Sequence, residues 1–391
     1  GLLFLGSNLT FRGDEWVTIL YAEDWSVDRL MDPHYIHWAM GTRVLWNVLQ
    51  ALFGLGSYVP YLAVLLAFHV AIATGLFTLA RRQVPAFIAL AVGTLFLFLG
   101  SGAGNVQLAF QRGWNAAAAA GIFALLILLR EPRPHHRWLG AILLLLGTIT
   151  WSSIGLLFVA AAGAVMLLVP SRRRDLWTVV PALVAFATWY VAYGRGTVGE
   201  IPGLALVQRY VVDGIANATG QTFGLGAEVG LVLAVLFAVA ALVNLVGGRR
   251  LRLLLIAGSV ALVVQWLLLA WARAIPEPNA FTSTRYVYIS AIFILMALVG
   301  LLGYRGWRRQ AHRVPFIAGV LAVFVVAFAW NVHELYRSDQ RKQLDAYDHR
   351  AAIEFVATYA GTPAVPLEQS YASVDRFLRR LADDEDPRSG A

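Results

Sequence analysis

Long apolar runs alternate with short polar segments along most of this chain. Each run approaches the ~20 residues that a helix needs to cross ~30 Å of hydrocarbon. The pattern therefore predicts membrane-spanning helices rather than the amphipathic helices of a soluble domain. The expected spans cover residues 58–80, 86–101, 115–130, 138–151, 154–170, 176–193, 228–246, 253–271, 287–304 and 314–332.

The chain opens with the apolar run GLLFLG, which is too short to cross a membrane. We interpret it as the outer end of a further helix whose beginning is missing. With that helix, the pattern predicts an all-α, polytopic transmembrane bundle of about eleven spans.

Composition supports this interpretation: 59% of the 391 residues are hydrophobic, 14% are charged, and the mean hydropathy is +0.65. A soluble domain carries more polar surface. The net charge of +8 does not indicate nucleic-acid binding, because the arginines fall in short clusters between the apolar runs. The chain has no cysteine, which excludes disulfides and thiolate metal sites.

The basic clusters predict the topology, because cytoplasmic loops of membrane proteins are enriched in arginine and lysine. Every second loop carries such a cluster, so the remaining loops are expected outside. The clusters are Arg81-Arg82, Arg130/Arg133/Arg137, Arg172-Arg173-Arg174, Arg249-Arg250/Arg252 and Arg305/Arg308/Arg309/Arg313. We expect a transmembrane domain over residues 1–333, whose first outer loop is 11–57, and a short helical extracytoplasmic tail over 334–391. The loop at 194–227 is also expected outside.

Chemistry concentrates in the first outer loop, from Arg12 to Trp46. Asp14 and Glu15 directly follow the first apolar run, and Asp24 lies in a second acidic pair nine residues later. A carboxylate at an apolar boundary is partly desolvated, which raises its pKa and suits it to general-base catalysis. Ordinary solvated loop acids remain the alternative for each of them.

Aromatic and histidine side chains accompany these acids. Trp16 and Trp25 suit stacking on a sugar face, although tryptophans also favour membrane interfaces in general. The spacing Asp32-x-His34-x-x-His37 resembles a metal-ligand pattern, but the sequence contains no second ligand cluster. We therefore predict no dedicated metal site and expect His34 to contact an anionic substrate.

Later outer loops supply positive charge. Arg285, followed by Tyr286, begins the span expected at 287–304, where an arginine is costly unless it meets an anion such as a lipid phosphate. Arg273 begins the same loop, and Gln111 and Arg112 lie in the loop GAGNVQLAFQRGWN. For Arg285 and Arg273, the alternative is that their side chains snorkel toward lipid headgroups.

Taken together, these residues resemble the GT-C superfamily of membrane glycosyltransferases, which use polyprenyl-phosphate-linked sugars. Asp14-Glu15 opens the first outer loop as in protein O-mannosyltransferase-like members, and DPHYIHW is similar to their Asp-x-His-Pro pattern and to the PHNGH-type motif of bacterial members. LFGLGSYVPY, AFQRGW, WSSIGL and STRYVYI fall where uncharacterised bacterial relatives carry similar marks. His34 is followed by Tyr35 where the stricter pattern has proline.

The resemblance implies an enzyme of the bacterial plasma membrane that transfers a sugar, with inversion, to an acceptor hydroxyl on the outer face. It implies Asp14 as the general base, with Glu15 or Asp24 in support or holding a divalent ion. It implies that Arg285, Arg273, Arg112, His34 and Tyr286 bind the donor phosphate, and that Trp16, Trp25, His37 and Gln111 contact sugar or acceptor. The partners would be the lipid-linked donor, membrane lipids, and a glycan, lipid or protein acceptor.

Two other functions fit the same pattern. A transporter or flippase for a lipid-linked or anionic substrate would carry charged residues deep inside its spans, whereas here the charges lie mainly at span ends. An O-antigen-ligase-like or polymerase-like enzyme would also use a polyprenyl carrier, and the loop at 194–227 would suit it.

Overall fold

The computed structural model describes residues 2–130, 133–195, 200–246, 252–303 and 314–359. Within these ranges every regular element is helical, and the only β-type pairing is an isolated bridge between His34 and His37. The first half of the chain forms α1 (Leu2–Leu5), η1 (Gly6–Asn8), α2 (Asp14–Leu20), α3 (Val27–Met31), α4 (Met40–Phe53), α5 (Val59–Arg81), α6 (Ala86–Leu97), η2 (Gly100–Gly102), α7 (Gly104–Gln107), η3 (Ala109–Gln111), α8 (Arg112–Leu128), α9 (Pro134–Thr150) and α10 (Ser152–Leu168).

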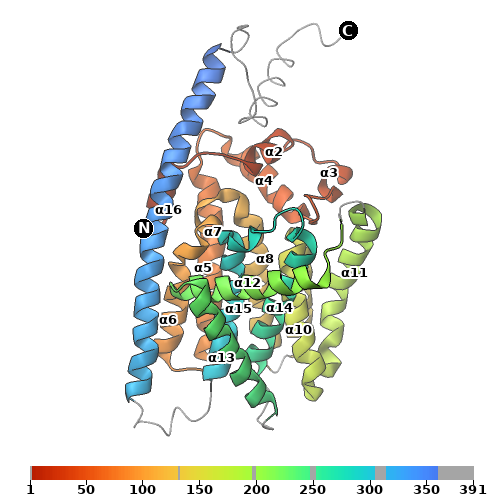
Figure 1. Ribbon diagram of the computed structural model, residues 1–391. Helices are drawn as coiled ribbons and strands as arrows, with labels where there is room; N and C mark the ends of the chain where they lie inside the picture. Colours follow the sequence, from red (N-terminus) through yellow and green to blue (C-terminus); the bar gives the residue numbers. More distant parts are fainter. Residues whose placement is uncertain (1, 131–132, 196–199, 247–251, 304–313, 360–391) are drawn as a thin grey trace.

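The second half continues this helical arrangement around the same bundle (Figure 1). Its elements are η4 (Pro170–Val179), α11 (Val180–Trp189), the π-helical turn η5 (Tyr190–Gly194), α12 (Leu204–Phe223), α13 (Ala227–Val246), α14 (Leu253–Arg273), η7 (Ala280–Thr282), α15 (Thr284–Leu302) and α16 (Val314–Tyr359).

Five helical segments among the described residues are long and apolar enough to cross a membrane: Val59–Arg81, Pro170–Gly194, Leu253–Arg273, Thr284–Leu302 and Ala318–Tyr347. A sixth results if α12 and α13, which are bent by 102° at their junction, count as one span. The expected count of about eleven is not confirmed. One reason is that α8 and α9 have 17 residues each, or about 26 Å of helix, which falls short of the ~30 Å hydrocarbon core.

The segment at 194–227, expected as an outer loop, contains the 20-residue helix α12. This helix lies across the bundle in Figure 1 and packs on α13, α14, α15 and α16. Its pattern is amphipathic: Arg209 and Asp213 form an exposed ion pair, whereas Gly214 on the opposite face lies so close to the Trp266 ring that a Cβ would clash. Such a helix has no long apolar run, so a search for spans overlooks it.

The last helix, α16, continues without a break past residue 333, where a boundary between bundle and tail was expected. It packs closely on η2, because a Cβ on Gly100 would lie 2.0 Å from the Asn331 carbonyl oxygen. Asn331 also accepts hydrogen bonds through Oδ1 from the Ser101 backbone N–H and hydroxyl at 3.1 and 3.0 Å. The remainder of the expected tail, 360–391, lies outside the described residues.

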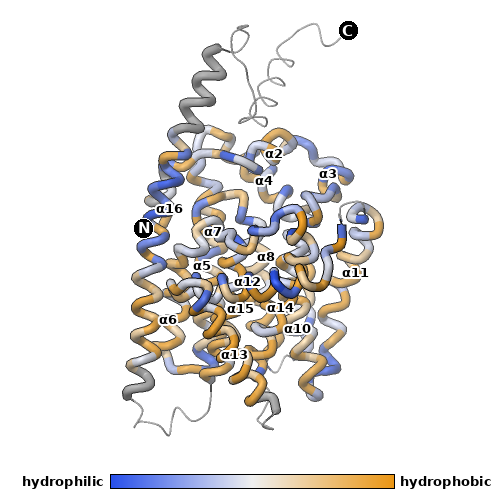
Figure 2. The backbone as a smooth tube through the Cα atoms, viewed as in Figure 1, coloured by the Kyte–Doolittle hydropathy of each residue, from blue (hydrophilic) through white to orange (hydrophobic). Residues whose placement is uncertain are grey.

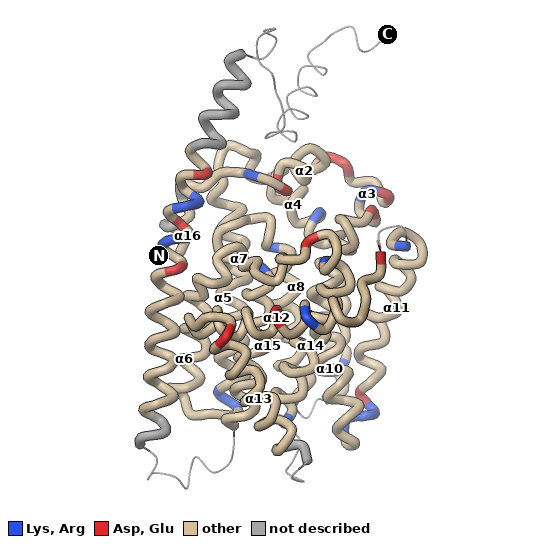
Figure 3. The backbone as a smooth tube through the Cα atoms, viewed as in Figure 1, with Lys and Arg blue, Asp and Glu red and all other residues tan. Residues whose placement is uncertain are grey.

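The polar cap of the molecule consists of α2, α3 and α4, which lie together at one end of the bundle (Figure 1). Figure 2 shows this end as more hydrophilic than the orange helices below it, and Figure 3 shows acidic residues gathered around α2 and α3. The arginine-bearing η4 packs against α9 and α10, at the end of the bundle opposite to the cap. The first loop is therefore a folded cap on the bundle.

Candidate functional site

Glu15 is buried in the cap, where it connects several segments, rather than exposed on the surface. Its side chain is fully buried and accepts hydrogen bonds from the backbone N–H of Arg12 at 2.9 Å, the Tyr58 hydroxyl at 3.0 Å and the backbone N–H of Phe110 at 2.8 Å. Burial raises the pKa of Glu15 to about 7, although the three donors act against that shift. Glu15 thus ties α2 to the start of α5 and to η3, out of reach of a ligand.

Asp14, one position earlier, is half-buried at the first turn of α2. Because successive residues of a helix are rotated by ~100°, the two neighbouring carboxylates face different surroundings. Burial raises the pKa of Asp14 above its ordinary value, while the positive charges of Arg285 and Arg273 lower it in part. The structure therefore brings Asp14 within the electrostatic reach of both predicted phosphate-binding arginines.

Those two arginines share one carboxylate, which the sequence analysis did not single out. Arg273 Nη1 pairs closely with Glu277 Oε1, and Arg285 Nη2 lies 4.0 Å from Glu277 Oε2. Arg273 also lies over the Tyr35 ring at 5.6 Å, and Arg285 over the ring of Tyr286 at 5.1 Å. The i,i+4 spacing of Arg273 and Glu277 at the end of α14 is a sequence signal that could have identified this pair.

The two histidines form a tight turn instead of a metal site. His34 and His37 exchange backbone hydrogen bonds of 2.9 and 3.0 Å, and Tyr35 between them has φ +55°, a left-handed conformation that non-glycine residues rarely adopt. The turn is attached to α10 because Trp38 N–H donates to the Ser152 hydroxyl and Ser152 N–H donates to the Trp38 carbonyl, both at 3.0 Å.

Both imidazoles are neutral at physiological pH. Burial, followed by the charges of Arg43 and Arg29, lowers the pKa of His34 to about 4, and burial with Arg273 lowers that of His37 to about 3. A neutral histidine offers an anion one N–H donor but no charge. Within the described part of the chain, no three His, Cys, Asp or Glu side chains are grouped as metal ligands.

A cavity of about 500 Å³ opens beside this cluster, between α10, α11, α14 and α15. Its wall is mostly apolar. The polar or amphipathic lining residues are Tyr35, His37, Trp114, Ser152, Ser153, Tyr190, Glu200, Gln265, Trp271, Arg273 and Tyr286. A second cavity of about 660 Å³ is enclosed by α12, α13, α14, α15 and α16, and no charged residue lines it. The first cavity is therefore the candidate site.

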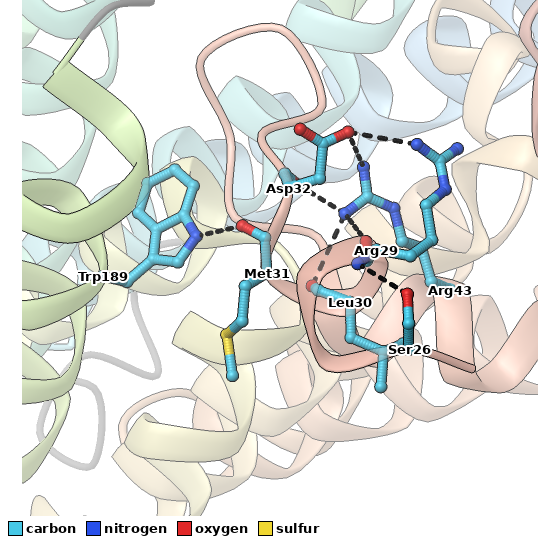
Figure 4. A network of polar contacts seen from close by, with 7 residues as sticks. All are labelled: Ser26, Arg29, Leu30, Met31, Asp32, Arg43 and Trp189. Carbon is cyan, nitrogen blue, oxygen red and sulfur yellow. Dashed lines mark hydrogen bonds and ion pairs between the residues drawn. The ribbon is translucent and has the colours of Figure 1, made fainter. Parts of the chain in front are cut away.

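The acidic residues further along the cap have structural contacts. Arg29 Nη1 donates to Asp32 Oδ2 at 3.0 Å, and Arg43 Nη1 donates to the carbonyls of Arg29 and Asp32, as Figure 4 shows. Trp189 of α11 donates from Nε1 to the Met31 carbonyl at 2.7 Å in the same view and stacks on Trp38. This network fastens α3 to α4 and α11, so Asp32 is held as a structural counter-ion.

Several predicted site residues do not line the cavity. Asp24 is exposed and accepts a hydrogen bond from the Ser26 N–H at 2.9 Å. Hydrogen bonds from the Ser26 side chain and backbone lower the pKa of Asp24. Trp25 is 50% exposed, and Trp16 packs edge-on against Phe11 in the cap. Neither tryptophan lines the cavity, and Asp24 is not among the charges that act on Asp14.

Arg112 and Gln111 are buried at the start of α8. Arg112 Nη1 donates to the Ala109 carbonyl at 2.8 Å, and its guanidinium lies 3.9 Å over the Trp46 ring. These contacts hold the buried Arg112 side chain against α4, and Arg112 does not line the cavity described above. Of the predicted residues, Arg273, Tyr286 and His37 line the cavity. Asp14 and Arg285 do not line it, but the charges of Arg285 and Arg273 both act on Asp14.

The described residues form a helical bundle with five or six candidate membrane spans and a largely apolar cavity that Arg273 lines. Comparison with known proteins finds no matching family, no similar curated protein and no similar solved structure.

Proposed function

We propose that this protein is a membrane glycosyltransferase that moves a sugar from a polyprenyl-phosphate-linked donor to an acceptor hydroxyl. One observation carries the proposal: Asp14, a half-buried carboxylate of raised pKa, lies under the influence of Arg273 and Arg285, and Arg273 lines a largely apolar cavity. This combination provides a base, a positive site for phosphate and an apolar surface for a prenyl chain.

In the proposed reaction, Asp14 accepts the proton of the acceptor hydroxyl as its oxygen attacks the anomeric carbon. The bond between that carbon and the phosphate oxygen breaks, and its electron pair remains on the phosphate. Arg273 and Arg285 stabilise the charge that develops there. Attack from the face opposite the leaving phosphate inverts the anomeric configuration. The raised pKa of Asp14 supports the role of base.

We further propose that the active face lies outside a bacterial plasma membrane, and that shorter apolar helices complete the membrane-embedded bundle. The arginine clusters in every second loop support this orientation, because cytoplasmic loops are enriched in arginine and lysine. The acceptor belongs to the cell envelope as a glycan, lipid or protein.

The Asp14→Asn variant tests the base directly. We expect it to fold normally and to lose transfer by a factor of about 10²–10⁴, the usual contribution of a general base. The measurement is the release of polyprenyl phosphate by purified protein in proteoliposomes, using a panel of polyprenyl-phosphate-linked hexoses and pentoses with a crude envelope extract as acceptor.

Asp28→Asn is the matched control, because Asp28 is an exposed acid of the same cap. It should retain wild-type transfer. In the wild type, kcat/KM should fall as acidification protonates Asp14, and at a higher pH than an ordinary aspartate would produce, because its pKa is raised. Full activity of Asp14→Asn, or transport of the labelled donor without its cleavage, would refute the proposal.

A further inference from the structure

Two buried polar groups in the cavity wall lack partners within the described residues: the Gln265 side-chain oxygen Oε1 and the Trp114 indole nitrogen Nε1. Both residues line the cavity of about 500 Å³ beside Arg273. Their side chains are almost fully buried, with 4% and 5% exposed. Folded proteins leave few buried polar groups without a hydrogen bond, so two such groups in the wall of one cavity need an explanation.

The orientation of the Gln265 amide follows from its neighbours. Its nitrogen Nε2 lies 3.1 Å from the Tyr286 carbonyl oxygen and 3.0 Å from the Ser290 hydroxyl. A carbonyl only accepts, so the amide group facing it must be the NH₂, and the acceptor Oε1 is left for another donor. The two bonds join α14 to α15, as polar side chains do between membrane helices, but they leave Oε1 unexplained.

Trp114 is held by tilted contacts of its ring with two aromatic neighbours rather than by a hydrogen bond of its nitrogen. Its ring lies 5.8 Å from the ring of Tyr286, the residue whose carbonyl holds Gln265, and 5.7 Å from Trp151. Tyr286 thus fixes both residues in place. Both residues that carry an unpaired polar atom therefore contact Tyr286, which also lines the cavity.

We propose that Gln265 and Trp114 recognise the hydroxyl groups of a glycosyl moiety bound next to the phosphate at Arg273. A sugar hydroxyl donates and accepts at once, so it complements a free acceptor paired with a free donor. A plain alkyl or prenyl phosphate would satisfy the arginine and the apolar wall but neither of these two groups. This inference rests on the proposed function and adds residues that select a glycosyl phosphate over a bare phosphate.

Binding of short-chain probes tests the inference without catalysis. The probes are citronellyl phosphate and its glucosyl, galactosyl and mannosyl phosphodiesters, titrated calorimetrically into detergent-solubilised protein carrying Asp14→Asn to prevent turnover. At least one glycosyl ester should bind about tenfold more tightly than citronellyl phosphate. Gln265→Met and Trp114→Phe should each reduce that preference about five- to tenfold, as expected for a lost hydrogen bond.

Ser290→Ala is the control, because it removes one bond between α14 and α15 while leaving Oε1 free for a ligand. It should lower the melting temperature slightly and keep the glycosyl preference. Trp114→Phe retains the aromatic stack, so it remains informative if Gln265→Met folds poorly.

The inference is overturned if no glycosyl ester binds more tightly than citronellyl phosphate, or if both variants keep the wild-type preference. A failure of the proposed function gives a different result: the glycosyl preference depends on Gln265 and Trp114, yet the protein with Asp14 intact cleaves no lipid-linked sugar.

Discussion

At the scale of single residues, adjacent acids in the sequence have separate roles. Asp14 and Glu15 form an obvious pair in the sequence, and their position beside an apolar run suggests raised pKa values. The structure divides the pair: Glu15 accepts three hydrogen bonds inside the cap, whereas Asp14 faces Arg273 and Arg285. Sequence cannot make this division, because the donors to Glu15 come from positions 58 and 110.

Replacing Glu15 should therefore affect folding before chemistry. Glu15→Ala leaves three buried donors unpaired, at about 1–3 kcal/mol each, and should lower the melting temperature in detergent strongly. Glu15→Gln keeps an oxygen for Tyr58 and Phe110 and should cost far less. Thermal unfolding followed by intrinsic fluorescence measures the difference.

The pH dependence of stability provides the second readout. The pKa of Glu15 is raised to about 7 in the folded state, so the folded protein binds more protons than the unfolded chain between the ordinary glutamate pKa and about 7. The Glu15 contribution should thus favour folding below that window and weaken as pH rises through 7. Glu15→Gln should remove this slope, and an unchanged slope would contradict the assignment.

At the scale of elements, apolar runs were located well and amphipathic elements were not. The expected span at 253–271 is α14 (Leu253–Arg273), and that at 58–80 is α5 (Val59–Arg81). The sequence does not predict α12, because Arg209, Asp213 and several amides interrupt the apolar run that a span would need. Window hydropathy reports on whole runs, while packing of one helix face is a tertiary property.

The docking of α16 depends on a polar cluster around Gln107 that no motif indicates. Lys342, the only lysine of the chain, donates through Nζ to the Ala103 carbonyl and to Gln107 Oε1, both at 2.9 Å. Ser338 donates to the same oxygen at 3.0 Å. The sequence marks these residues only as polar positions far apart, so their meeting could not be predicted.

Removing the Lys342 amino group should loosen α16 from α7. Each of its hydrogen bonds contributes about 0.5–1.5 kcal/mol, so Lys342→Met should lower the melting temperature and speed protease cleavage within α16. Arg337→Met is the matched control, because its 3.9 Å pair with Glu334 is solvent-exposed and contributes little. Equal protease sensitivity of the two variants would argue against docking through Lys342.

At the scale of the whole molecule, the candidate site assembles segments that lie far apart in sequence. The sequence supplies most of its parts, including Asp14, Arg273, Arg285 and Tyr286, from local arguments about charge at membrane boundaries. It does not supply Glu277, Gln265 or Trp114. Gln265 and Trp114 become candidates only in the structure, where both line the cavity between α10, α11, α14 and α15 and each has an unpaired polar atom.

The proposed orientation can be measured, because the chain has no cysteine and is a ready background for single-cysteine labelling. Asp28, Arg337, Arg81 and Ser171 are all exposed. Asp28→Cys and Arg337→Cys should react with a membrane-impermeant maleimide in right-side-out vesicles, and Arg81→Cys and Ser171→Cys only in inside-out vesicles.

The physical reason is that α5 separates residue 28 from residue 81 by one candidate span, while the arginine clusters favour the cytoplasmic side for residues 81 and 171. Labelling of Asp28→Cys and Arg81→Cys from the same side would mean that α5 does not cross the membrane. The reverse pattern, with residue 28 inside, would place Asp14 and the cavity entrance in the cytoplasm. A donor sugar presented outside could not then reach them, so this measurement tests the orientation on which the proposed chemistry depends.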